Sequence, residues 1–249
     1  MRFTFAVIGT AAYAAFLVAL MPASFVAKQA EAQTRGGLQV HEASGTIWKG
    51  GGRATVATPA GPLAIERFTW RFLPSRLASG RVGFQVEGVS SGFTGRGEVG
   101  RALATWEARD VAVAGDARGI GSFLPLLAHW RPEGTLSMDA PRLAWDEREM
   151  RGEAKLEWRA AAMALSEVRP LGSYRVEVRG DGGPAKITLQ TLEGALRLSG
   201  HGTLAPPSRL TFSGEARGEA AHAAKLAPLL DLMGPPRADG SRSLEWRIP

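Results

Sequence analysis

The sequence predicts a mainly β protein: an N-terminal transmembrane helix, then an antiparallel, curved sheet built from two repeated β-rich units, each ending with a short helix. Three observations predict this fold. First, residues 3–27 carry no charge. Second, from Thr34 onward apolar residues alternate with polar ones with a period of two. Third, glycine-rich segments separate the alternating runs. The chain has 249 residues, 31 glycines and no cysteine, with 45% apolar and 22% charged residues. This composition is globular and excludes collagen-like, disordered and disulfide-stapled chains.

The N-terminal segment, residues 1–33, is expected to be a membrane anchor or a signal peptide with a short linker. Its densest apolar part, residues 3–21, is long enough to cross a bilayer, which takes roughly 17–25 apolar residues. It is also longer than the roughly 7–15-residue core of a cleaved signal peptide. However, Ala30-Glu31-Ala32 has the small-x-small form of a cleavage site. Both interpretations export the remainder of the chain.

Alternation of side chains predicts the strands. Val82, Phe84 and Val86 fall on one face, with polar or small residues between them, which is typical of a half-buried strand. Glycine-rich stretches at 50–52, 88–100 and 180–183 read as turns, and their spacing favours a meandering antiparallel sheet. Similar alternation is found at residues 69–72, 136–138, 174–178, 196–198, 210–212 and 244–248.

Two stretches break this pattern and resemble short helices, residues 122–130 and 223–233. Each contains a proline, Pro125 in the first and Pro228 in the second. Because proline is tolerated best in the first turn of a helix, we expect the helices to begin near Phe123 and Ala227.

A weak internal repeat relates the two halves of the exported part. Gly50, Gly95, Pro125 and Gly134 recur, in order, as Gly152, Gly200, Pro228 and Gly240. We therefore expect two β-rich repeat units, residues 34–140 and 141–249, arranged as a stacked or continuous sheet.

No group of residues with enzymatic chemistry is evident, so we predict no catalytic, cofactor-binding or metal-binding residue and no cofactor. The four histidines, His41, His129, His201 and His222, are far apart and have no metal-ligand spacing. Without cysteine there is no thiol nucleophile. The glycines of residues 92–97 are interpreted as a β-turn or bulge, and the charged run at residues 146–149 as a solvated loop.

The charge and the aromatic residues do not indicate nucleic-acid binding. The net charge of +6 comes from 30 basic residues interleaved with 24 acidic ones, without the clustering that phosphate binding requires. The seven tryptophans are most simply structural. Trp48, Trp70, Trp130 and Trp158 are the weak candidates for docking, because they lie in the motifs described next.

Several motifs resemble those of the type II secretion system protein N family, an accessory component of the bacterial general secretion pathway. The clearest is residues 44–50, SGTIWKG, which resembles the family's opening S-G-T-hydrophobic-W-x-G signature; others lie at 68–74, 129–134, 158–161, 170–174 and 239–240. The resemblance implies a non-enzymatic, single-pass inner-membrane protein with a periplasmic domain. Its partners would be other type II secretion components, and it carries over no catalytic residues.

A more distant resemblance, of architecture and not of motifs, is to the AsmA-like envelope proteins. These join an N-terminal anchor to repeated β-rich units and are associated with lipid handling. In a single curved sheet, alternation would place all apolar side chains on one face. That face is expected to be either a closed hydrophobic core or an apolar groove for lipid.

Overall fold

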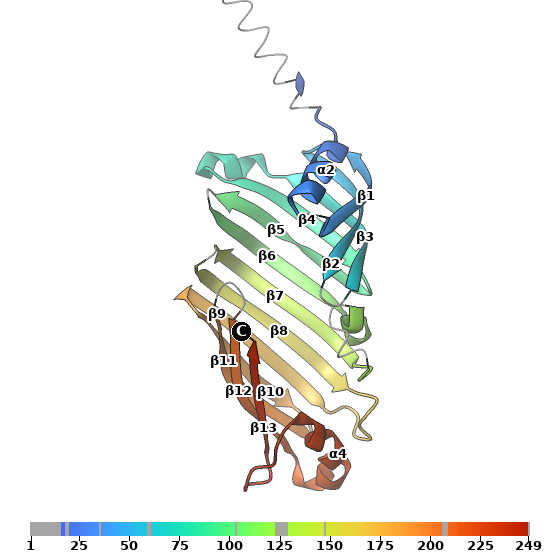
Figure 1. The fold of residues 1–249 in the computed structure, drawn as a ribbon, viewed down its shortest axis with the longest axis vertical. Coiled ribbons are helices and arrows are strands. Elements are labelled where there is room, and N and C mark those ends of the chain that lie inside the picture. The colour runs from blue at the N-terminus through green and yellow to red at the C-terminus, as the bar shows by residue number, and fades with distance from the viewer. Residues whose placement is uncertain are drawn as a thin grey trace, which may run out of the picture.

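In the computed structural model, one antiparallel sheet contains every strand of the described residues. These are residues 16–17, 20–34, 36–58, 61–102, 104–122, 129–146, 148–205 and 209–248. Within them, thirteen strands pair strictly in chain order from β1 to β13 (Figure 1). The terminal strands β1 and β13 form the two edges of the sheet and do not pair with each other. The expected mainly β, antiparallel meander is therefore confirmed.

Many of the strands are joined by tight turns, whereas residues 117–132 connect β6 to β7 and residues 219–241 connect β12 to β13. The strands are β1 (Leu38–Gly45), β2 (Lys49–Thr58), β3 (Gly61–Phe72), β4 (Val82–Ser90), β5 (Phe93–Ala102), β6 (Thr105–Asp116), β7 (Glu133–Trp145), β8 (Met150–Ala162), β9 (Gly172–Gly183), β10 (Ala185–Glu193), β11 (Leu196–Ala205), β12 (Arg209–Gly218) and β13 (Arg242–Ile248). The helices whose bounds lie within the described residues are α2 (Ala23–Gln33), α4 (Ala223–Met233) and the 3-10 helices η1 (Pro74–Ser79), η2 (Ala117–Ser122) and η3 (Ala220–His222).

The turn between β4 and β5 shows how local sequence sets the hairpins. Ser91 and Gly92 both have positive φ, 50° and 82°, as in the two-residue turn whose twist matches that of the flanking strands. The interpretation of residues 92–97 as a turn or bulge is confirmed: Gly92 is in the turn, and Gly97 lies at a register shift between β5 and β6.

Residues 50–52, expected to form a turn, belong instead to β2. Gly50 pairs with Trp70 on β3, and the Trp70 ring lies where a Cβ of residue 50 would be. The glycine leaves room for the indole to lie flat across the neighbouring strand. This role produces the same sequence signal as a turn.

Residues that pair across two strands point to the same face of a sheet, so the registers define two faces of opposite character. Phe84 on β4 pairs with Phe72 on β3 and Val99 on β5. The next residue, Gln85, pairs with Arg71 and Glu98. We call the first the apolar face and the second the polar face. The predicted strand through residues 82–86 is confirmed, although Val82 at its start is exposed.

The two repeat units are not evident as separate bodies. The sheet is continuous, and β7 pairs along most of its length with both β6 and β8. Residues 140 and 141, where the second unit was expected to begin, lie within β7. The strand continues through this point with one register shift against β8, between Asp139 and Arg142, so no linker separates the halves.

Helix α4 begins at Ala223 and not near Ala227, so that Pro228 lies inside the helix. The loss of one main-chain N–H there is offset by the burial of Leu226, Leu229 and Leu230. The other expected helix falls mainly on residues 123–128, outside the described residues.

Most of the apolar stretch 3–21 also lies outside the described residues. Among the helices that are described, none combines the length and the hydropathy that a membrane crossing requires. Helix α2 follows that stretch and packs against β1, the first strand of the sheet (Figure 1).

Candidate interaction surface

The apolar face is largely open over the middle of the sheet. Val82, Trp106 and Leu156 on this face expose 47%, 41% and 39% of their surface. In the described part of the chain, the α-helices contact the sheet only near its ends, α2 at β1 and α4 at β12 and β13. A domain ordinarily buries an apolar sheet face under a second layer. Here the central strands have no such layer among the described residues.

The C-terminal end of the same face is covered. Leu226, Leu229 and Leu230 of α4 pack with Leu196, Phe212 and Leu244 of the sheet in one buried cluster. Residues 163–171, between β8 and β9, add Met163, Val168 and Leu171 to it. Of the two alternatives left open by the sequence, a closed hydrophobic core is found at this end of the sheet.

Two of the candidate tryptophans belong to the covered end. The Trp158 indole N–H donates to the Glu133 carbonyl at 3.0 Å, and Trp130 packs against the buried cluster. Beside them the Tyr174 hydroxyl donates to the Leu196 carbonyl at 3.0 Å, and burial raises the pKa of this tyrosine. These side chains have structural partners and are not free for docking.

The other two candidates stabilise the N-terminal end. The Trp70 indole N–H donates to the Thr46 carbonyl at 3.2 Å. The Trp48 ring meets the edge of Phe72 at 4.8 Å between ring centres, and Phe72 lies 5.5 Å from Phe84. These aromatic contacts hold the β1–β2 connection against β3 and β4.

The polar face carries arginines and glutamates in mutual contact. Glu107 lies 3.3 Å from Arg81, 3.0 Å from Arg109 and 3.9 Å from Arg142. The pKa of Glu157 is lowered by hydrogen bonds from Arg175 and Arg159. Because these charges neutralise one another, the face differs from the uniformly basic surface that binds a phosphate backbone.

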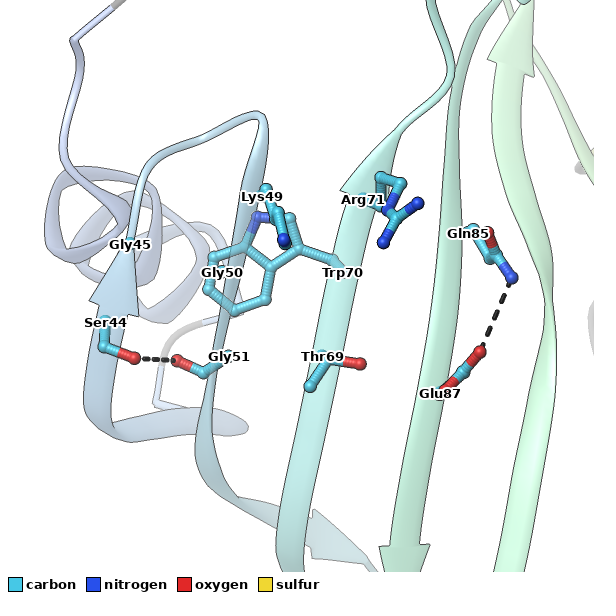
Figure 2. A pocket seen from close by; sticks show the side chains of 10 residues that line it. All are labelled: Ser44, Gly45, Lys49, Gly50, Gly51, Thr69, Trp70, Arg71, Gln85 and Glu87. Carbon is cyan, nitrogen blue, oxygen red and sulfur yellow. Dashed lines mark hydrogen bonds between the residues drawn. The ribbon is translucent and has the colours of Figure 1, made fainter.

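Shallow hollows lie on the polar face. The one in Figure 2 extends across β1 to β4, where the Ser44 hydroxyl donates to the Gly51 carbonyl at 3.3 Å and the Gln85 amide to Glu87 at 3.5 Å. The first pair joins β1 to β2 and the second lies on β4, so strand β3 separates them. The side chains stand beside one another instead of converging on one point, so the hollow offers a contact surface and no acid–base pair.

The structure does not bring the histidines together. His41 lies on β1, His129 before β7, His201 on β11 and His222 before α4. Within the described residues, no three His, Cys, Asp or Glu side chains are placed to hold a metal ion.

Asp146, Arg148 and Glu149 of the charged run lie in the connection between β7 and β8. The Asp146 carboxylate accepts the main-chain N–H groups of Arg148 at 2.8 Å and Glu149 at 2.9 Å, and these hydrogen bonds lower its pKa. Glu147 lies outside the described residues. The loop interpretation fits this geometry.

Sequence reasoning missed the exposed aromatic residues of the apolar face. Trp106 and Trp145 pair with each other across β6 and β7, and Trp246 on β13 exposes 59% of its surface. The alternating pattern placed such residues on strands. The register between strands, which the sequence does not contain, was needed to see which ones meet.

The fold and its surfaces define a class of protein: a single open amphipathic sheet suited to contact with other molecules. Comparison of the sequence with known protein families identifies the family to which it belongs. The sequence model of the family described as type II secretion system (T2SS), protein N, matches residues 36–245, and the chain belongs to this family. The family indicated by the sequence motifs is thus confirmed. No curated protein and no solved structure matches the chain.

Proposed function

We propose that this protein is a non-enzymatic accessory subunit of the type II secretion system that takes part in export across the outer membrane. Membership in the protein N family supports a role in this apparatus. The observation that carries the proposal is the open sheet, whose two extended faces offer contact area and, among the described residues, no convergent catalytic groups. Exposed sheet faces and edges are common docking sites.

In this proposal the sheet lies in the periplasm and the N-terminal segment holds it at the inner membrane. The uncharged residues 3–27 support this placement. Intact-mass spectrometry of protein purified from membranes tests it. An uncleaved chain is expected, and a mass beginning at Gln33 would identify the segment as a removed signal peptide.

A deletion and complementation experiment tests the role in secretion. Removing the gene is expected to reduce export of type II substrates, and normal export would contradict the proposal. Complementation with Leu156→Asp, which charges the apolar face, is then compared with Gln190→Asp, which places the same side chain on the polar face. If docking uses the apolar face, only Leu156→Asp should fail to restore export.

A second candidate function is the binding or transfer of lipid along the apolar face. The specific observation is that Val82, Trp106 and Leu156 are all exposed on the same face of the sheet, because apolar surface left outside a core often marks an interaction site. In addition, the Arg101 guanidinium lies 5.1 Å from the centre of the Trp106 ring, where it would favour an anionic headgroup.

Phospholipid analysis separates the two candidates. Protein extracted in mild detergent is expected, on the lipid hypothesis, to retain phospholipid detectable by mass spectrometry, and Leu156→Asp should retain less than Gln190→Asp. If the protein is lipid-free and still restores export, only the docking function remains supported.

A further inference from the structure

Strand β13 presents an unpaired main-chain edge. On its outer side the Ser243 N–H donates to the Pro235 carbonyl at 3.2 Å. Because main-chain groups alternate in direction along a strand, the N–H and C=O groups of Glu245 and Arg247 also point outward. In the described part of the chain, no strand lies beyond β13 and no loop hydrogen bond reaches these groups.

The opposite edge, at β1, is protected. The outward N–H of Leu38 donates to the Thr34 hydroxyl at 3.0 Å, and α2 packs against the strand. The register shifts between His41 and Ser44, and Glu42 has a positive φ of 54°. Irregular strands and covering segments are the usual means of blocking edge pairing.

The side chains at the open edge are self-complementary. Glu245 and Arg247 lie on the polar face, because they pair with Ser213 and Thr211. Trp246 lies between them on the apolar face, stacked on Phe212 at 5.5 Å between ring centres. Arg247 has no acidic partner within the described residues.

We propose that β13 pairs antiparallel with β13 of a second copy of this chain, with each Trp246 opposite the partner's Trp246. In this register Glu245 lies opposite the partner's Arg247, and Arg247 opposite the partner's Glu245. The outward-pointing main-chain groups form the hydrogen-bonded pairs. The two tryptophans form the non-hydrogen-bonded pair, whose Cα atoms lie about 4.5 Å apart. The twofold contact therefore gives hydrogen-bond partners to the outward main-chain groups of both strands. It also places an opposite charge beside Glu245 and Arg247 of each copy.

The neighbouring structure limits the contact to a few residues. Pro236 bridges to Arg242 at the start of β13, so the second copy pairs only along residues 244–248. Paired residues share a face, and the apolar faces of the two copies would consequently lie on the same side. The dimer thus forms one sheet of twice the width, a property beyond the function proposed above.

A heterologous contact between β13 and β1 fits less well. Thr34 already occupies the outward N–H of Leu38 at the β1 edge. An isologous contact uses one patch twice and closes after two copies, whereas an edge-to-edge contact of β13 with β1 would continue as a filament.

A charge exchange tests the register. The full chain in mild detergent is examined by size-exclusion chromatography with light scattering over a range of concentrations. Arg247→Glu and Glu245→Arg each place like charges opposite one another at two positions. Each is expected to raise the dimer dissociation constant by about tenfold or more. The double variant E245R/R247E recreates both opposite-charge pairs and should restore the dimer.

The outcomes are distinguishable from misfolding. Both charged side chains are exposed, and circular dichroism should show the same β spectrum for all variants. A full chain that stays monomeric at every concentration would overturn the proposal. So would a dimer that the single charge reversals leave unchanged, or a double variant that does not recover.

A crosslink provides an independent readout, because the chain contains no cysteine. Trp246→Cys places two thiols at the twofold axis, where the Cα separation of about 4.5 Å lies within the range of disulfides. Oxidation is expected to give a covalent dimer. Val82→Cys, also exposed on the apolar face but on β4, is the control and should not crosslink. Equal crosslinking of both variants would contradict the proposed contact.

Discussion

The covered and the open parts of the apolar face share one sequence pattern and differ in what lies over them. At the C-terminal end α4 packs on the sheet, and Leu226 is fully buried. At β8 the side chain of Leu156, which alternation places on the same face, stays 39% exposed. The comparison teaches that strand periodicity specifies which face is apolar, whereas a separate covering element decides whether that face becomes core or surface.

Removing the contact between α4 and the sheet is expected to have the largest effect on the free energy of unfolding. Leu226→Ala deletes a fully buried side chain and should lower the free energy of unfolding by about 2–5 kcal/mol, the usual cost of such a cavity. Chemical denaturation monitored by circular dichroism measures the change. Lys225→Ala, on an exposed position of the same helix, is the control. Equal, small effects of both variants would show that α4 does not stabilise the sheet.

The second-largest effect on the free energy of unfolding is expected at a tight contact near the N-terminal end of the sheet. Gly50→Ala would place a Cβ against the Trp70 ring and the Ser44 carbonyl, and overpacking of this kind costs about 1–3 kcal/mol. Gly183→Ala is the matched control, because no heavy atom lies within 4 Å of the added Cβ. Thermal unfolding compares the two. A Gly50→Ala protein as stable as the control would contradict the assigned role of this glycine.

The sequence predicted the positions of the strands better than it predicted which side chains and helices pack against them. Alternation at Val82, Phe84 and Val86 is a local signal, and β4 forms where it predicts. The glycine at residue 50 was misread because a turn and a ring-covered strand both require the absence of a side chain. Pro228 misplaced the start of α4, since burial of the helix on the sheet outweighs a local preference that the sequence shows.

The candidate surface could be predicted only in part for the same reason. The motifs around Trp48 and Trp158 indicated the family, yet these tryptophans are anchored by structural contacts. The exposed residues Trp106, Trp145 and Trp246 become neighbours or edge residues only through strand register. Register is set by the pairing between two strands and includes shifts such as those between β7 and β8, which alternation within one strand does not encode.

On the polar face, the ion pairs of Glu157 predict a modest pH dependence. Arg175 and Arg159 hold its pKa below the ordinary value of 4.5. The native state therefore binds this proton less readily than the unfolded chain, and the stabilisation is present above pH 4.5. It is lost as the pH falls through the lowered pKa. Glu157→Gln should reduce the melting temperature at neutral pH, with the difference from wild type shrinking at acidic pH.

The matching control for this prediction is Glu66→Gln, an exposed glutamate for which no salt bridge or hydrogen bond is found among the described residues. Its melting temperature should follow that of the wild type at every pH. A difference for Glu157→Gln that stays constant between neutral and acidic pH would show that the ion pairs contribute nothing to folding.

The smallest effect is expected where the apolar face is open. Leu156→Thr keeps a residue suited to a strand and removes little buried contact, so the free energy of unfolding should change by only about 0.5 kcal/mol. Chemical denaturation of this variant beside Leu226→Ala measures both parts of the face in one experiment. If an additional layer covered the centre of the sheet, Leu156 would behave as a core residue, and its loss would cost as much as that of Leu226. Near-neutral behaviour, combined with loss of export or of bound phospholipid in Leu156→Asp, would mean that this apolar surface is maintained for contact with another molecule and not for folding.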